Sequence, residues 1–223
     1  MSRSSLAAST SSSTLLPEVR VLKFLLLTLV VGAVVADVAA KRVAENRIET
    51  QLASSIDGVD EVDAEIESFP FIPAVLNGHF DGLRLSIPRV ASRGLRVSQL
   101  ELNLRGVEFS ALDVFAGSGE VRVAGGEGTA QVTDRAITRA LRAKAIDVRV
   151  SFEGSDAVIE AAGRTQTVDD VELADGAVRF VLPTGPVSLD LPETLESVSY
   201  ESAHVENGHL RLDLVLEGKR LEL

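Results

Sequence analysis

A chain of 223 residues, 45% of them hydrophobic, is long enough for one domain with a substantial core and a terminal appendage, which excludes a protein that is disordered throughout. The formal net charge is −11, and no run of Lys and Arg interleaved with aromatic residues appears, so we expect no nucleic-acid partner. The lack of cysteine excludes disulfides, thiolate metal sites and a catalytic thiol.

The first forty residues predict an exported protein. Residues 1–20 are rich in Ser and Thr and lack periodicity, which is typical of a disordered leader. Residues 21–40 contain thirteen consecutive uncharged residues, Phe24 to Ala36, behind the basic Arg20 and Lys23. A basic start followed by an apolar run is the layout of a signal sequence.

Two fates of residues 21–40 remain open. The small residues around Val38 and Ala40 are compatible with cleavage after Ala40. The uncharged run is shorter than the roughly 20 residues that cross a bilayer, but the whole segment reaches that length if Lys23 snorkels and Asp37 sits at the interface. The segment is therefore either a cleaved signal sequence or an anchor that holds a periplasmic or cell-envelope protein in the plasma membrane.

Residues 41–223 are predicted to form one domain that begins with a helix. Val43, Ile48, Leu52 and Ile56 recur on one helical face, opposite charged side chains. After this helix, apolar and polar residues alternate, which is typical of antiparallel strands with one solvated face and predicts one long sheet. The alternating apolar positions are Val62, Ala64 and Ile66; Leu83, Leu85 and Ile87; Leu100, Leu102 and Leu104; Val121 and Val123; Val148, Val150 and Phe152; Val178 and Phe180; and Leu210, Leu212, Leu214 and Leu216.

Glycine-containing segments between these runs predict hairpin turns at AGSGE, AGGEG, EGSD, ADGA and ENGH. The glycines of AGGEGTA, residues 124–130, are reminiscent of a phosphate cradle. The segment lacks the Lys-Ser/Thr end of such a cradle and opens onto a strand, so a hairpin loop is favoured. A second, short helix is predicted at TDRAITRALRAKA, residues 133–145, with Thr133 or Asp134 capping its first turn.

No catalytic or metal centre is predicted. The three histidines, His79, His204 and His209, are too scattered for a zinc motif. A G-x-S-x-G nucleophile motif is missing, and the serines concentrate in the leader and in turns. We therefore expect a protein that binds its ligand without a cofactor, and not an enzyme.

The segment SFPFIPAVLNGHF, residues 68–80, concentrates Phe and Pro in a chain that has only eight Phe and seven Pro. Two interpretations stay open. In one, Phe69 and Phe71 are core residues, the prolines stiffen a crossing, and Asn77-Gly78 is the left-handed cap of a short helix. In the other, a rigid apolar lip admits a lipid to a groove. The lip would consist of Phe69, Phe71, Ile72, Leu76 and Phe80.

The same segment resembles the signature of the LmeA-like phospholipid-binding family, in which Phe-Pro-Phe precedes a short helical turn, a Gly and a strand of alternating apolar residues. Ser68 to Ile87 match that order. The likeness extends from the apolar leader through KRVAENRIETQL, ALDVFAGSGEVRV and GTAQVTDRAITRAL to VENGHLRLDLVLEG, roughly residues 22 to 217. The family is found on exported envelope proteins and is similar to the tubular lipid-binding superfamily.

The resemblance implies an α+β fold in which a strongly twisted antiparallel sheet wraps around a long helix, with a second short helix, and encloses an acyl-chain groove. This agrees with the alternation, because a sheet with one apolar face must close on itself or curl around a helix. The implied partners are phospholipid, the outer surface of the plasma membrane and proteins of envelope biosynthesis. The candidate lipid-binding residues are Phe69, Pro70, Phe71, Ile72, Leu76, Gly78 and Phe80, and the candidates for a basic headgroup patch are Arg84, Arg89, Arg93 and Arg96.

The favoured function is an exported phospholipid-binding or lipid-transfer protein of the bacterial cell envelope, with acyl chains held in an apolar groove. An alternative is a non-lipid envelope protein that uses the same lip to dock a membrane-bound partner such as a glycosyltransferase. A hydrolase with an unrecognised site is the third hypothesis.

Overall fold

The structure, a computed structural model, describes residues 16–55, 59, 61–92, 94–110, 120–192 and 198–222, with the backbone alone for residues 16–27, 55, 92, 120 and 219–222. The described helices are α1 (Leu16–Ser55), α2 (Phe71–Leu76) and α4 (Asp134–Ala143). The described strands are β1 (Asp63–Glu67), β2 (His79–Ser92), β3 (Leu95–Phe109), β4 (Glu120–Thr133), β5 (Val148–Glu153), β6 (Asp156–Ala161), β7 (Arg164–Thr167), β8 (Asp170–Ala174), β9 (Ala177–Val181), β10 (Val187–Asp190), β11 (Val198–Glu206) and β12 (His209–Glu222).

The strands form three antiparallel sheets among the described residues. The largest has the order β1-β2-β3-β4-β12-β11, and two smaller sheets have the orders β10-β9-β8 and β5-β6-β7. Each alternating run predicted from the sequence falls within a strand, except that Val62 lies just before β1. The prediction of an α+β fold built mainly on antiparallel sheet is therefore confirmed, whereas three sheets replace the one long sheet that alternation alone suggested.

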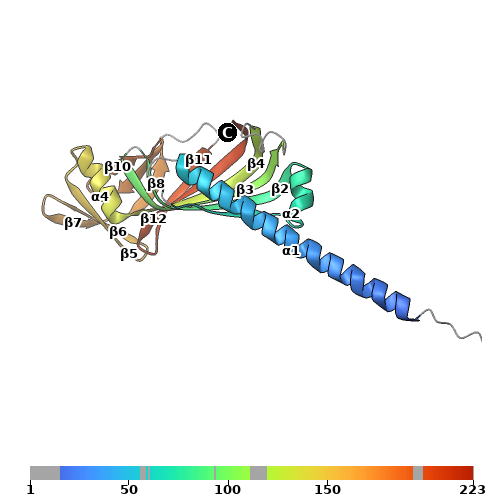
Figure 1. Cartoon of the computed structure of the whole chain (residues 1–223). Helices are drawn as coiled ribbons and strands as arrows, with labels where there is room; N and C mark the ends of the chain where they lie inside the picture. Colours follow the sequence, from blue (N-terminus) through green and yellow to red (C-terminus); the bar gives the residue numbers. More distant parts are fainter. Residues whose placement is uncertain are drawn as a thin grey trace, which may run out of the picture.

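Helix α1 runs without a break through residues 21–40 and on into the helix predicted at the start of the domain, as far as Ser55. Its C-terminal half lies over the body beside β1 and α2, and its N-terminal half projects away from the body (Figure 1). Ala44, Ile48 and Leu52 pack against the core. The expectation that the sheet wraps around a long helix is not confirmed, because α1 lies along the edge strand and then leaves the body. Among the helices of the described ranges, none is long and apolar enough to cross a membrane.

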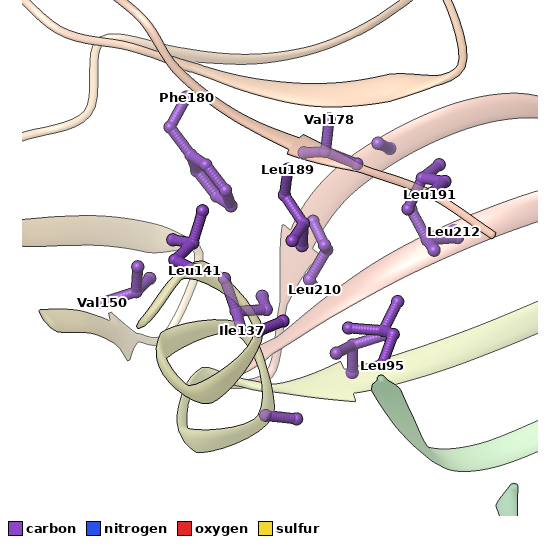
Figure 2. Packing of buried hydrophobic residues seen from close by; sticks show 14 of the residues in the cluster. Leu95, Ile137, Leu141, Val150, Val178, Phe180, Leu189, Leu191, Leu210 and Leu212 are labelled. Atoms are coloured by element: carbon purple, nitrogen blue, oxygen red, sulfur yellow. The ribbon is translucent and has the colours of Figure 1, made fainter. Parts of the chain in front are cut away.

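The interior consists of two main clusters at opposite ends of the largest sheet. In one, Ile137 and Leu141 of α4 point toward Phe180, Leu189 and Leu210 (Figure 2). Each such fully buried side chain contributes roughly 1.5–3 kcal/mol. The predicted cap of α4 is confirmed, since the Thr133 hydroxyl accepts a hydrogen bond from the N–H of Ala136.

The second cluster brings α1 and α2 onto the other end of the sheet. Its buried members include Ile66 of β1, Phe71 of α2 and Phe80 of β2. The half-buried Leu102 of β3 packs against both clusters. The fold thus has one packed end around α4 and another around α1 and α2, joined by the long strands.

The prediction that AGGEGTA is a hairpin loop was wrong, because the segment lies inside β4. Gly128 pairs with Leu102 of β3 on one side and with Leu214 of β12 on the other. A Cβ on Gly128 would lie 2.7 Å from Cδ2 of Leu102 and 3.4 Å from Cβ of Leu214. Glycine is therefore needed here so that leucines of the flanking strands can close over the strand between them.

Three other predicted turns are confirmed. EGSD joins β5 to β6, ADGA joins β8 to β9, and ENGH joins β11 to β12. In ADGA, Asp175 and Gly176 have φ of 55° and 72°, the two positive values that a type I′ hairpin requires. The AGSGE segment lies almost entirely outside the described residues.

Gly78 ends α2 under two constraints. Its φ is +64°, and its carbonyl oxygen accepts a hydrogen bond of 2.9 Å from the N–H of Phe109. A Cβ at this position would overlap the carbonyl oxygen of Phe109. The left-handed cap predicted at Asn77-Gly78 is thus also a close contact with the last residue of β3.

Gly78→Ala is expected to lower the free energy of unfolding by clearly more than the roughly 1–2 kcal/mol that alanine costs at a positive φ. The matched control is Gly176→Ala, whose φ is similar but whose added Cβ would meet no atom within 4 Å. Urea unfolding followed by circular dichroism measures both variants. Equal losses would show that the contact with Phe109 does not constrain this position.

Candidate functional site

Helix α2 buries one aromatic side chain beneath it. Phe71 is 5% exposed, and its ring stacks on that of Phe80 with the centroids 5.8 Å apart. Phe80 in turn contacts Phe109, with centroids 4.6 Å apart. Aromatic pairs in this range contribute stabilisation beyond the area that they bury. The three rings therefore fix α2 on the sheet.

The other side of α2 exposes apolar side chains. Phe69, Ile72 and Leu76 are 71%, 40% and 78% exposed. Ile72 and Leu76 are four residues apart in α2 and so share one side of the helix, and Phe69 lies just before the N-cap of the helix. We call these three residues the α2 face.

The first turn of α2 takes its cap from another helix. Pro70, at the N-cap position, supplies no side-chain hydrogen bond. Instead the carboxylate of Asp37 on α1 accepts hydrogen bonds of 2.7 Å from the N–H groups of Phe71 and of Ile72. A carboxylate satisfies unpaired N–H groups at a helix start and also interacts well with the helix dipole. Asp37 thus ties α1 to α2.

Two further carboxylates of α1 serve the edge strand β1. The N–H of Ala64 donates to Glu49 over 3.2 Å, and the N–H of Ile66 donates to Glu45 over 3.0 Å. Four residues of an α-helix and two residues of a β-strand each span about 6 to 7 Å. The distance from Glu45 to Glu49 along α1 therefore matches the distance from Ile66 to Ala64 along β1. Glu45 is only 3% exposed, and Lys41 lies 3.6 Å from its carboxylate. The helix therefore takes the place of a neighbouring strand along β1.

Immediately before Asp37, α1 is apolar and exposed on every side. Residues 28–36, TLVVGAVVA, carry no charge and are all exposed. We call them the α1 apolar segment. Because Asp37 bonds to the start of α2, the α2 face lies next to the point where this segment leaves the body. The segment and the α2 face together are the candidate functional site.

The seven predicted lipid-binding residues divide between the surface and the interior, and their role in binding lipid remains a prediction. The three residues of the α2 face fit the lip interpretation, and the buried rings fit the core interpretation. Phe69, Pro70, Ile72 and Leu76 are exposed, Phe71 and Phe80 are buried in the core, and Gly78 is a half-buried turn residue at the end of α2.

Sequence reasoning missed the role of the α1 carboxylates. Asp37 was considered only as an interfacial residue of a possible anchor, and the structure buries it against α2. A signal was available, because Glu45 and Glu49 recur on the same helical side as the apolar Ile48 and Leu52. Acids on the apolar side of a helix indicate buried donors opposite them.

The predicted basic patch is only partly described. Arg84 donates to Glu65 over 3.0 Å and also pairs with Glu67, so its charge is already balanced. Arg89 and Arg96 are exposed, and Arg93 lies outside the described residues. Arg84 is therefore a poor candidate for a headgroup ligand.

A polar cluster on β11 and β12 contains Ser, His and Asp but is not arranged for nucleophilic catalysis. Ser202 donates to Asp213 over 2.6 Å and Arg211 donates to its other oxygen over 3.0 Å. Burial acts to raise the pKa of Asp213, but these hydrogen bonds outweigh it and lower that pKa below its ordinary value. His204 lies 3.7 Å from the same carboxylate. Since the serine hydroxyl is bonded to Asp213, His204 does not activate it.

Comparison with known proteins gives one match. A family model described as LmeA-like phospholipid-binding matches residues 35–215. No curated protein and no solved structure matches the chain. The matched range begins just before Asp37 and ends within β12, so it includes the contact between α1 and α2 and the three sheets except the end of β12.

Phe71→Asp is expected to lower the free energy of unfolding by about 3–5 kcal/mol, because it removes a buried ring and buries a carboxylate without a partner. Leu76→Asp adds the same charge at an exposed position and is expected to cost about 1 kcal/mol or less. Chemical unfolding of the two variants gives both values. Similar losses would contradict the division of this segment into a buried and an exposed side.

Proposed function

The chain belongs to the LmeA-like phospholipid-binding family, and from this premise we propose that it is an exported cell-envelope protein that binds phospholipid at the outer surface of the plasma membrane. The observation that carries the proposal is the continuity of the α2 face with the α1 apolar segment. Release of the bound lipid elsewhere in the envelope would make the protein a lipid-transfer protein.

An apolar surface of this kind requires an apolar covering. Large contiguous apolar patches are rare on monomeric soluble proteins and mark protein or membrane contacts. Acyl chains supply such a covering, and each buried methylene contributes about 0.8 kcal/mol. In a family of phospholipid-binding proteins, lipid is therefore the favoured occupant. A membrane-bound envelope protein, such as a glycosyltransferase, is the alternative occupant of the same surface.

The Asp37 contact favours a retained anchor over a cleaved signal sequence. Cleavage after Ala40 would remove the carboxylate that accepts the N–H groups of Phe71 and Ile72. Two buried or half-buried donors would then lack their acceptor, at roughly 1–3 kcal/mol each. We therefore propose that residues 21–40 stay on the mature protein and hold it at the membrane.

Leu76→Asp is expected to reduce phospholipid binding about tenfold, because a charge on the α2 face would have to be desolvated against acyl chains. The matched control is Thr165→Asp, which adds the same charge at an exposed position on β7. The full chain is extracted from membranes in a neutral detergent, and retained phospholipid is quantified by mass spectrometry of organic extracts. Retention that is unchanged in a folded Leu76→Asp variant would remove the α2 face from the site.

The exported protein is expected to keep Asp37. Its intact mass, measured after isolation from the envelope, should place the N-terminus upstream of that residue, and a reporter fused after residue 45 should be active outside the cytoplasm. A mature chain that begins at Lys41 would contradict retention of the anchor. Reporter activity confined to the cytoplasm would contradict export itself.

A further inference from the structure

A hollow of about 490 Å³ lies between α4 and β5, and four of its lining residues are arginines. Figure 1 shows α4 at the end of the body far from the projecting half of α1. We propose that this hollow binds the phosphate group of an anionic ligand. The four arginines are Arg135, Arg139, Arg142 and Arg149.

Helix α4 gathers three of these side chains on one side. Arg135, Arg139 and Arg142 are spaced by four and three residues, so they share a face. The opposite face carries Ile137 and Leu141, both fully buried in the core. Burial of the apolar face therefore presents the three guanidinium groups outward together.

A hydroxyl contact brings the fourth arginine to the same place. The Thr138 side chain accepts from the N–H of Val150 over 2.9 Å and donates to the carbonyl of Val150 over 3.3 Å. This pair of bonds fixes α4 against β5. Arg149 and Ser151, the neighbours of Val150 on the strand, consequently line the hollow beside α4.

The arginines of the hollow are weakly neutralised. Arg142 lies 3.9 Å from Asp147, and Arg149 lies 3.9 Å from Glu160. Within the described part of the chain, no carboxylate pairs with the guanidinium groups of Arg135 and Arg139. The Asp134 carboxylate, which also lines the hollow, accepts instead from the backbone N–H of Arg135 over 2.6 Å.

Two arginines of the large sheet are paired more closely than those of the hollow. Arg84 approaches Glu65 to 3.0 Å, and Arg105 approaches Glu127 to 2.9 Å. The chain has 33 acidic residues against 22 basic ones, so a site with excess positive charge runs against its overall composition. Four arginines and one carboxylate, Asp134, line this hollow, so its lining carries an excess of positive charge that an anion would balance.

Phosphate is the anion that suits this site. Guanidinium groups form bidentate hydrogen bonds with phosphate oxygens, and several of them can serve one group. A volume of about 490 Å³ exceeds a bare phosphate and falls within the range of small-ligand sites. The ligand is therefore a phosphorylated group of headgroup size, from a lipid or from a soluble compound. Only the lipid source rests on the proposed function.

The test uses the full chain in neutral detergent micelles. Calorimetric titrations use inorganic phosphate, glycerol phosphate and micelles doped with phosphatidylglycerol. The Arg135→Gln/Arg139→Gln variant is expected to lose about tenfold or more in affinity, since two charge-assisted contacts are removed. The control, Arg122→Gln/Arg164→Gln, makes the same charge change at exposed positions on β4 and β7 and should stay within about twofold of the unaltered chain. Circular dichroism verifies that both variants are folded.

The probes distinguish the two sources. Binding of glycerol phosphate or inorganic phosphate that the α4 variant loses supports a soluble ligand, and binding of phosphatidylglycerol alone that the same variant loses supports a lipid headgroup. Absence of binding to all three probes, binding that the α4 variant keeps, or an equal loss in the control variant would overturn the proposal. Phospholipid retention through the α2 face is measured separately with Leu76→Asp, so the failure of one proposal is distinguishable from the failure of the other.

Discussion

The arrangement of the N-terminal third depends on three carboxylates of α1 that accept backbone hydrogen bonds. An edge strand and a helix start both present N–H groups without partners. Asp37, Glu45 and Glu49 satisfy four of these groups, on α2 and on β1. A buried carboxylate is costly unless it is hydrogen-bonded, so sliding α1 along β1 would break several contacts at once. The position of α1 is therefore specified by polar contacts as well as by apolar packing.

This constraint explains why the segment with the most Phe and Pro follows β1. The backbone of α2 is held from one direction by Asp37 and from the other by the stacking of Phe71 on Phe80. A helix of six residues has little stability of its own, because nucleation costs more than so few hydrogen bonds return. External support is what allows such a short helix to keep apolar side chains in solvent at defined positions.

Much of the fold was predictable because alternation and helical periodicity report local burial. The Leu210 to Leu216 run and the Thr133 cap are examples, since each depends on neighbours in sequence. Gly128 was misread because a glycine required by side chains on two other strands looks in sequence like a turn glycine. The exposed side of α2 was predicted by only one of the two interpretations that the sequence left open. The roles of the α1 carboxylates and of the α4 arginines were missed because they depend on the elements packed beside them, β1 and α2 in the first case and β5 in the second.

Because α1 is continuous, it also determines the orientation and distance of the sheets relative to the α1 apolar segment. A continuous helix resists rotation about its axis. Any contact that holds residues 28–36 in one orientation therefore also holds the sheets in one orientation about that axis. The same contact fixes the distance of the sheets along the helix axis, because the eight-residue rise from Leu29 to Asp37 spans about 12 Å. Each residue added between these points would raise the body by about 1.5 Å and turn it by about 100°. The number of residues between these points therefore determines both how far the body lies from residues 28–36 and which of its surfaces faces a given direction.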